Sequence, residues 1–138
     1  MHPAFWGPHG WIFLHSITFA YPTNPSDEDK KHYFNLFNNL HHVLPCYQCA
    51  QHYEEHLKKY PLTNKIMSDR QNLVEWLILI HNEVNLSLNK PILTTEEVIQ
   101  VYNQKIHETR YKNTYTEYIP YCVFIIIILV LLVLYIRK

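Results

Sequence analysis

Cys46 and Cys49 are the only cysteines of this chain that are close in sequence, because the third, Cys122, lies far beyond them. The two residues between them put both sulfurs within one helical turn, close enough for an exchangeable disulfide. Pro45 predicts that a helix begins here. A thiol at a helix N-terminus has a lowered pKa and a raised thiolate fraction. The pair therefore indicates redox chemistry, metal binding, or two buried cysteines that never react.

Metal binding has one supporting feature, which is that His52 and His56 follow the cysteines on the same predicted helix. A tetrahedral zinc ion needs four ligands at about 2.0 to 2.3 Å, and ligands spread over three turns of one helix cannot converge on it. Among 10 histidines, two spaced four residues apart are unsurprising on a solvated helix face. We therefore predict no metal site. A thioredoxin-like fold is also disfavoured, because no strand precedes the cysteines.

Three further polar side chains are predicted on helix faces that are otherwise apolar. His15 lies one turn after Trp11, and His81 lies one turn before Asn85. A single histidine in such a place is usually a satisfied core residue. Three polar groups beside a tryptophan, on helices expected to pack near the cysteines, are typical of the lining of a site for a planar ligand.

Helices interrupted by prolines must position these residues, because no strand-like alternation of apolar and polar residues persists. Pro8 suits the first turn of a helix. Ser26 with Asp29 has the spacing of a capping box, and so has Thr94 with Glu97. The expected helices run from Pro8 to about Tyr21, Ser26 to Leu44, Cys46 to about Tyr60, Ser68 or Asp69 to Leu88, and Thr94 to Ile106. The fourth is expected to be the central core helix, with a wide apolar stripe of Leu73, Trp76, Leu77, Ile80, Val84 and Leu88.

Length and composition limit what the chain can do. Its 138 residues have room for one small domain besides a distinct tail. Twelve Lys and Arg balance twelve Asp and Glu, so the formal net charge is zero. The chain therefore has no excess of positive charge that would favour a nucleic acid as partner. With only two glycines, a Gly-rich loop that cradles phosphates is excluded, and any nucleotide must be held differently.

The tail, residues 119–136, contains no charged residue and as a helix would extend about 27 Å, which nearly spans a bilayer. A buried core helix is the alternative, but such a helix normally keeps a polar stripe, and residues 123–134 have none. We expect a transmembrane helix. No secretory signal stands at the start, so residues 1 to about 105 are expected to face the cytosol. Residues 107–118 are polar and Tyr-rich and are interpreted as a tether.

Three ordered motifs resemble those of the Erv/ALR family of FAD-linked sulfhydryl oxidases over residues 4–106. They are Trp6-Gly7-Pro8-x-x-Trp11-x-x-x-His15, Pro45-Cys46-x-x-Cys49, and His81-Asn82-Glu83-Val84-Asn85 followed by Lys90-Pro91. The resemblance implies an all-α fold, a four-helix bundle with a short fifth helix, which binds FAD at one end and usually forms a homodimer. A short core with an apolar tail is most similar to the oxidases of large cytoplasmic DNA viruses, which implies a host or virion membrane.

The resemblance also implies a role for each matching residue. Cys49 corresponds to the sulfur next to the flavin, and Cys46 to the sulfur that meets the substrate. The residues matching the family's FAD contacts are Trp11, His15, His81, Asn82, Asn85, Lys90 and, as an aromatic residue against the cofactor, Tyr102. The expected reaction oxidises dithiols of a protein, such as a thioredoxin-like protein or a small CxxC carrier. Electrons then pass through FAD to oxygen and give hydrogen peroxide.

The chain departs from the family pattern in two ways. Ile78 and Thr95 stand where many relatives have a second, structural disulfide, so helix packing alone must hold the fifth helix. There is no shuttle pair of cysteines, and Cys122 has no partner. The organisation we predict is an oxidase domain over 1–106, a tether over 107–118 and a transmembrane helix over 119–136. The alternative is a tail-anchored helical adaptor with a structural or metal-binding CxxC.

Overall fold

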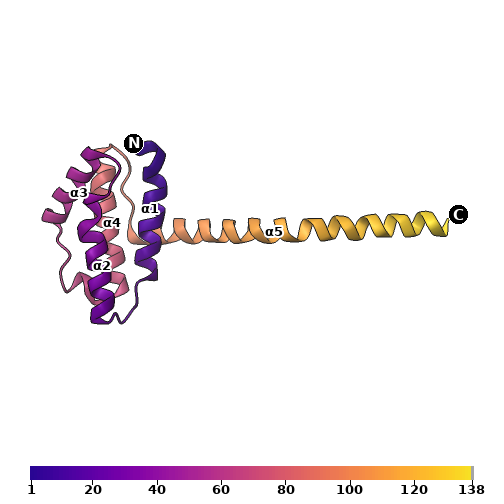
Figure 1. The fold of residues 1–138 in the computed structure, drawn as a ribbon, viewed down its shortest axis with the longest axis horizontal. Helices are drawn as coiled ribbons and strands as arrows, with labels where there is room; N and C mark the ends of the chain where they lie inside the picture. The colour runs from indigo at the N-terminus through magenta and orange to yellow at the C-terminus, as the bar shows by residue number, and fades with distance from the viewer. Residues whose placement is uncertain (138) are drawn as a thin grey trace. The chain divides into compact units, whose positions relative to one another are not determined.

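The computed structural model describes the backbone of residues 1–137, where all regular elements are helical (Figure 1). Five α-helices and two short 3-10 helices follow one another as α1 (Pro3–Ala20), α2 (Asp27–Asn39), η1 (Leu40–His42), α3 (Tyr47–Lys59), η2 (Ile66–Ser68), α4 (Arg70–Ser87) and α5 (Thr95–Ile136). The predicted all-α fold is confirmed. The chain divides into two compact units, Met1–Thr95 and the residues from Glu96 onward.

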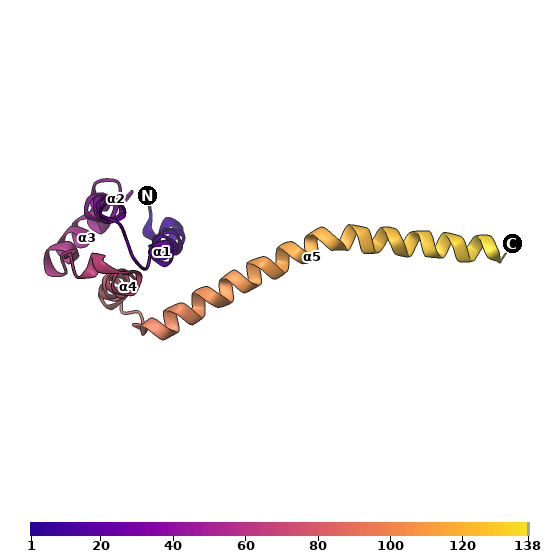
Figure 2. The same ribbon diagram turned by 90° about the horizontal axis from the view of Figure 1, so that it is seen from below.

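The first unit is a bundle of α1 to α4, which surround a common interior when seen nearly end on (Figure 2). The core is formed by Leu14, Tyr21, Phe37, Tyr53, Met67, Leu73, Trp76, Leu77 and Ile80. Four of these come from α4, as expected of the central core helix. The apolar stripe of α4 ends sooner than predicted, because Val84 is only half-buried and Leu88 is exposed.

Hydrogen bonds from aromatic side chains join the helices across this core. The Tyr21 hydroxyl donates to the Met67 carbonyl oxygen and the Tyr53 hydroxyl to the Phe37 carbonyl oxygen, both at 2.9 Å. Trp76 Nε1 donates to the Tyr60 carbonyl oxygen, also at 2.9 Å. Each donor is thus buried with a partner, so these large rings contribute apolar burial without an unsatisfied polar group.

The predicted start of the first helix is wrong. The helix begins at Pro3, with His2 as its N-cap, and the Ala4 N–H donates to His2 Nδ1 at 3.2 Å. Pro8 lies inside α1, where its missing N–H removes the bond to the Ala4 carbonyl. Pro3 and Pro8 are both acceptable in the first turn of a helix, where a missing N–H costs nothing. The helix begins at Pro3 because His2 caps it there.

The predicted starts of the second, third and fourth helices are confirmed by their caps. The Asp29 N–H donates to Ser26 Oγ at 3.1 Å, and the Ser26 N–H donates back to Asp29 Oδ2 at 2.9 Å, which completes the capping box. Asp69 caps α4 by accepting from the Asn72 N–H at 2.9 Å. Cys46 caps α3. The second helix ends at Asn39, and the chain continues as η1 rather than as α-helix to Leu44.

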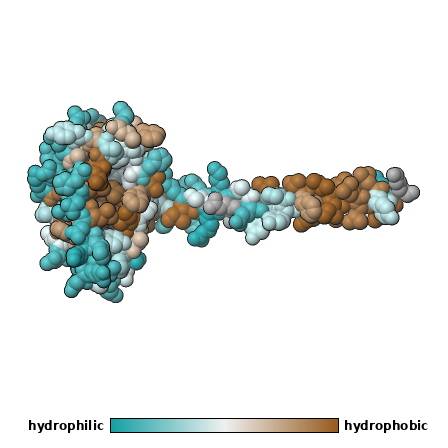
Figure 3. Space-filling view, in the orientation of Figure 1, coloured by the Kyte–Doolittle hydropathy of each residue, from teal (hydrophilic) through white to brown (hydrophobic). Residues whose placement is uncertain are grey.

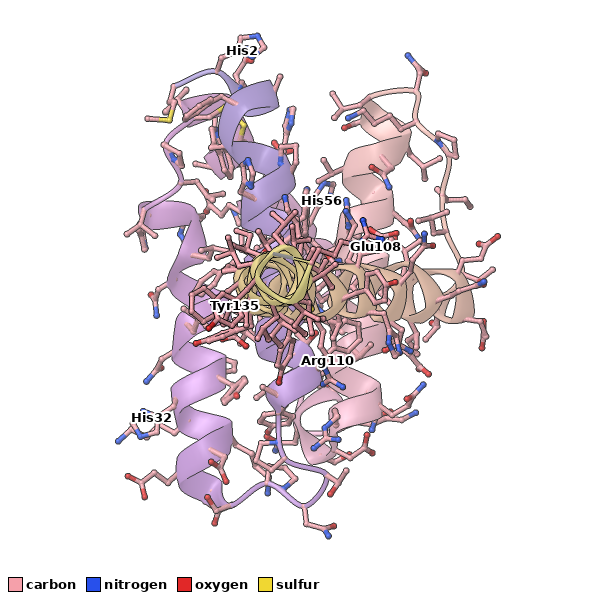
Figure 4. All side chains as sticks on the ribbon, turned by 90° about the vertical axis from the view of Figure 1, so that its right-hand side faces the viewer. His2, His32, His56, Glu108, Arg110 and Tyr135 are labelled. Atoms are coloured by element: carbon pink, nitrogen blue, oxygen red, sulfur yellow. A yellow bond between two sulfur atoms is a disulfide. The ribbon has the colours of Figure 1, made fainter. Side chains whose placement is uncertain are left out.

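The fifth helix, predicted to end at Ile106, continues as one helix to Ile136 and includes the segment interpreted as a tether. Bonds four residues apart support its polar half, as when Gln104 Nε2 donates to Glu108 Oε1 at 2.8 Å. The polar half of α5 lacks apolar periodicity because the helix is exposed to solvent there and buries no face, although its backbone is helical. Figure 4 labels Glu108 and Arg110 on this polar half and Tyr135 near the far end.

The second half of α5 is long and apolar enough to cross a membrane. Its side chains are exposed throughout, and Figure 3 shows apolar residues over the visible face of this part of α5. Within the described residues it is the one helix that meets these criteria. The structure thus offers one candidate membrane span.

Candidate functional site

The two cysteines form a disulfide at the first turn of α3. Their Cα atoms are 5.2 Å apart, and both residues are half-buried. Cys46 has the extended backbone of an N-cap (φ −144°, ψ 115°), and its Sγ accepts a hydrogen bond from the Cys49 N–H at 3.2 Å. An amide donor and the positive end of the helix dipole both stabilise a thiolate formed here. The site is therefore arranged for thiol–disulfide exchange.

A second group of predicted residues lies between α1 and α4. The rings of Trp11 and His81 stack with centroids 3.9 Å apart and planes within 8° of parallel. His15 Nε2 lies 3.0 Å from His81 Nδ1 and shares a hydrogen bond with it. His15 is fully buried and His81 is half-buried. The structure thus brings together three of the side chains that the sequence singled out.

The two histidines are neutral at physiological pH. Burial, and then the neighbouring His81, lower the pKa of His15 to about 3. Burial, and then the positive charge of Lys90, lower the pKa of His81 to about 4. One imidazole must therefore donate the shared proton while the other accepts it. The result is an uncharged pair of imidazoles beside Trp11, in which only the His81 ring is parallel to the indole.

The Asn82 amide has both of its polar atoms engaged with the loop after α4. Asn82 Nδ2 donates to the Leu93 carbonyl oxygen at 2.8 Å, and Asn82 Oδ1 accepts from the Leu93 N–H at 3.1 Å. The Lys90 N–H donates to the Asn85 carbonyl oxygen at 2.8 Å, next to the turn residue Asn89 with φ 53°. The loop that carries Lys90 is thus held to α4 at two points.

Two residues that the sequence analysis left without a role belong to the same region. Glu83, inside the third motif, accepts from the Tyr60 hydroxyl at 2.6 Å and from Lys59 Nζ at 3.2 Å. These two bonds, the Tyr60 bond first, lower the pKa of Glu83. Glu83 therefore joins the end of α3 to α4 two residues after His81. The position of Glu83 within the third motif is the sequence feature that could have indicated this role.

Trp6 is the other residue without an assigned role. Its Nε1 is buried and has no hydrogen-bond partner among the described residues. Its ring lies against Gly10, where a Cβ atom would stand 3.3 Å from the ring carbons. An unsatisfied buried donor costs about 1 to 3 kcal/mol, so this N–H fits an acceptor that the polypeptide itself does not supply.

These features fit FAD. The stacked rings of Trp11 and His81 suit a planar ring system, the neutral histidines offer hydrogen bonds without charge, and Trp6 supplies a free donor. Tyr102, on α5, is half-buried, and burial raises its pKa to about 12. Its contact with the cofactor stays a prediction. Among residues 1–137 no group of three His, Cys, Asp or Glu side chains stands where a metal ion could be held.

Comparisons with known proteins agree with this arrangement. The model of the Erv1/Alr family matches residues 8–111. A probable FAD-linked sulfhydryl oxidase of Acanthamoeba polyphaga mimivirus is 45% identical over 106 residues, which cover 77% of this chain and 74% of that protein. The FAD-linked sulfhydryl oxidase of African swine fever virus (isolate Pig/Kenya/KEN-50/1950) is 32% identical over 104 residues, 75% of this chain and 85% of that protein.

The fold is also similar to a solved structure. The crystal structure of the FAD binding domain of Erv1 from Saccharomyces cerevisiae superposes with a TM-score of 0.65 at 29% identity, over 70% of this chain and 89% of that chain. The whole mitochondrial oxidase of that yeast is longer, and the matched segment spans 43% of its length. The likeness therefore lies in the domain that binds the cofactor.

Proposed function

This chain belongs to the Erv1/Alr family, and from that premise we propose how its residues share the work of an FAD-dependent thiol oxidase. The protein forms disulfides in thiol substrates. The observation that carries the assignment of roles is the Cys46–Cys49 disulfide at the start of α3, in the same unit as the stacked Trp11 and His81.

Thiol–disulfide exchange begins at Cys46. A substrate thiolate attacks Cys46 Sγ, so that a substrate–Cys46 bond forms and the Cys46–Cys49 bond breaks. Cys49 leaves as a thiolate in the first turn of α3, where the helix dipole stabilises it. The second substrate thiol, once deprotonated, attacks the substrate sulfur of the mixed disulfide and releases Cys46. The substrate has then lost two electrons, which the cysteine pair has gained, and the two substrate thiol protons have passed to solvent, from which the released cysteine thiolates can take them up.

The residues of α1 and α4 hold the cofactor. When bound, FAD supplies a two-electron acceptor for the reduced cysteines, and we assign oxygen as the final acceptor, which yields hydrogen peroxide. Trp11 and His81 provide the flat surface, and the neutral His15 fixes the orientation of His81. Asn85, Lys90 and Tyr102 are assigned as further contacts. Asn82 acts through the loop that carries Lys90.

The test of these roles uses the full chain in detergent. We expect the purified protein to show flavin absorbance and to oxidise dithiothreitol with consumption of oxygen. Cys49→Ser and Cys46→Ser should each lose this oxidation and keep the flavin, because neither sulfur belongs to the surface that holds it. Folded protein that stays colourless after incubation with FAD would contradict the assignment of the cofactor residues. Wild-type turnover in both variants would contradict the assignment of the cysteines.

We further propose how the protein is placed and assembled. Residues 119–136 span a host or virion membrane, 107–118 connect this span to the oxidase domain of 1–106, and that domain faces the cytosol. The apolar, exposed second half of α5 supports the span. A homodimer is supported by the exposed side chains of Ile12 and Phe13 on α1. Light scattering of the solubilised protein would distinguish the dimer from a monomer.

A further inference from the structure

The segments around the disulfide carry no Asp, Glu, Lys or Arg. None occurs between Met1 and Ser26 or between His32 and Tyr53, so all of α1 and the first two turns of α3 are without them. The first charged side chain after the cysteines, Glu54, is paired with Lys58 at 2.8 Å. A partner that approaches Cys46 along these segments therefore meets no charged Asp, Glu, Lys or Arg side chain, and the one fixed charge there is the Met1 ammonium, which donates to the Pro45 carbonyl oxygen.

Four large apolar side chains next to the disulfide are exposed to solvent. We call them the apolar rim: Met1, Phe5, Val43 and Tyr47, with relative exposures of 72%, 72%, 74% and 77%. Single exposed apolar residues are ordinary on a protein surface, but several gathered beside a reactive group mark an interaction site.

Sequence and contacts bring the rim together. Val43 and Tyr47 flank Pro45 and Cys46 in the chain. The amino nitrogen of Met1 lies 2.8 Å from the Pro45 carbonyl oxygen, which places the start of α1 at the same end of the bundle. Phe5 lies one turn from it, since its N–H donates to the His2 carbonyl oxygen at 3.1 Å. In Figure 4, His2 lies at the opposite end of the bundle from His32.

Tyr47 is held in place before any partner arrives. Gln51 Nε2 donates to the Tyr47 hydroxyl oxygen at 3.0 Å, one turn along α3. This bond limits the rotamers of the exposed ring. A ring ordered in advance loses less conformational entropy when a partner covers it, and tyrosine is among the residues that contribute most at protein interfaces.

We propose that the apolar rim is the docking surface for the dithiol substrate, and that this substrate is a polypeptide whose cysteines are flanked by uncharged, apolar residues. The proposal rests on the exchange at Cys46. A substrate sulfur that reaches Cys46 brings its neighbouring residues onto the rim, where apolar side chains gain burial. Charged neighbours would lose water without gaining a side chain of opposite charge, and the Met1 ammonium already donates to the Pro45 carbonyl oxygen. Association is not steered by charge, so its rate is insensitive to salt.

The first measurement compares substrates on the full chain in detergent. The probes are dithiothreitol and three synthetic Cys-x-x-Cys peptides, flanked by leucine and phenylalanine, by glutamate, or by lysine. We expect kcat/KM for the apolar peptide to exceed that for either charged peptide by about tenfold. Its kcat/KM should change by less than about twofold when salt is raised from about 0.02 M to about 0.5 M. Preference for a charged peptide, with a steep salt dependence, would overturn the proposal.

The second measurement compares variants. Val43→Ser and Tyr47→Ser should each lower the ratio of kcat/KM for the apolar peptide to kcat/KM for dithiothreitol by about tenfold. Tyr47→Phe, which keeps the apolar ring but loses the bond to Gln51, should lower the ratio much less than Tyr47→Ser. Leu79→Ser, on α4, is the matched control at an exposed apolar side chain outside the rim.

An unchanged ratio in both serine variants, or an equal fall in the control, would overturn the docking surface while leaving the oxidase intact. A wild-type protein that oxidises neither dithiothreitol nor any peptide would instead contradict the oxidase function, and the docking proposal with it. The two failures are thus separated by the dithiothreitol activity of the wild type.

Discussion

At the scale of single residues, the site is built from side chains without charge at neutral pH. The buried His15 and its partner His81 accept burial only in the neutral form, as their lowered pKa values show. Sequence spacing was enough to predict that His15, His81 and Trp11 share a site. The hydrogen bond between the two imidazoles could not be predicted, because it depends on how α1 packs against α4.

The neutral histidine pair predicts a dependence of stability on pH. The folded-state pKa of His15, about 3, lies below the unfolded value of 6.5, so the unfolded chain binds the proton more readily. Stability is therefore full above pH 6.5 and falls as the pH is lowered toward the folded pKa. At pH 5 the loss from His15 is about 2 kcal/mol. Thermal melts from pH 7.5 to pH 5 should show a falling Tm, and His15→Gln should flatten that dependence. An equally steep curve in the variant would sink this explanation.

Asn82 illustrates a residue whose role the motif alone does not reveal. Its amide holds the Leu93 backbone, and with that the loop containing Lys90. We expect Asn82→Ala to loosen this loop even without cofactor, at a cost of about 1 to 2 kcal/mol for two bonds. Hydrogen exchange at the Leu93 amide, measured on apoprotein, checks this. Asn85→Ala is the control, because its carbonyl bond to Lys90 does not use the side chain. Unchanged exchange in Asn82→Ala would return Asn82 to the direct contacts with FAD.

At the scale of elements, local chemistry predicted the starts of three helices to within one residue. Ser26 with Asp29, Cys46 and Asp69 all cap as expected. The start of α1 was misplaced because Pro3 and Pro8 both suit a first turn. The end of the fifth helix was misplaced because apolar periodicity reports which face is buried, and an exposed helix has no such face.

The contact between α3 and α4 also belongs to this scale. Glu83 receives hydrogen bonds from Tyr60 and Lys59 and so fixes the helix that carries the disulfide against the helix that carries His81. Glu83→Ala should lower Tm and reduce kcat with dithiothreitol several-fold, because the helix that carries the disulfide is no longer fixed against the helix that carries His81. Glu83→Gln keeps an acceptor for Tyr60 and should retain most of the activity. Equal losses in both variants would show that the charge, rather than the joined helices, matters.

At the scale of the whole molecule, the side chains of the candidate site and the candidate membrane span lie in different units of the chain. The Cys46–Cys49 disulfide, the His15–His81 pair and the apolar rim all lie in the unit Met1–Thr95, whereas the candidate span lies in the following helix. Composition predicted a distinct apolar tail, because an uncharged stretch of that length is typical of a membrane span. Composition does not reveal that the polar connection is helical, which follows from bonds between residues four apart.

Removing residues 119–138 should therefore move the protein from the membrane to the soluble fraction without loss of flavin. In intact membranes, added protease should digest the oxidase domain of the full chain and leave a protected fragment of the tail. Fractionation and immunoblotting with tags at each end check both points. If the domain is protected instead, it lies on the far side of the membrane. A truncated protein that still sediments with membranes would exclude the span.

The disulfide encloses very little of the polypeptide, since its two cysteines are only three positions apart. The entropy that a cross-link removes from the unfolded chain grows with the length of the loop it closes, and a ring this small accounts for only about 2 kcal/mol. Opening it thus frees almost no chain, and we expect the same bundle to hold both oxidation states. The protein can give up this bond at every turnover because its architecture never depended on it.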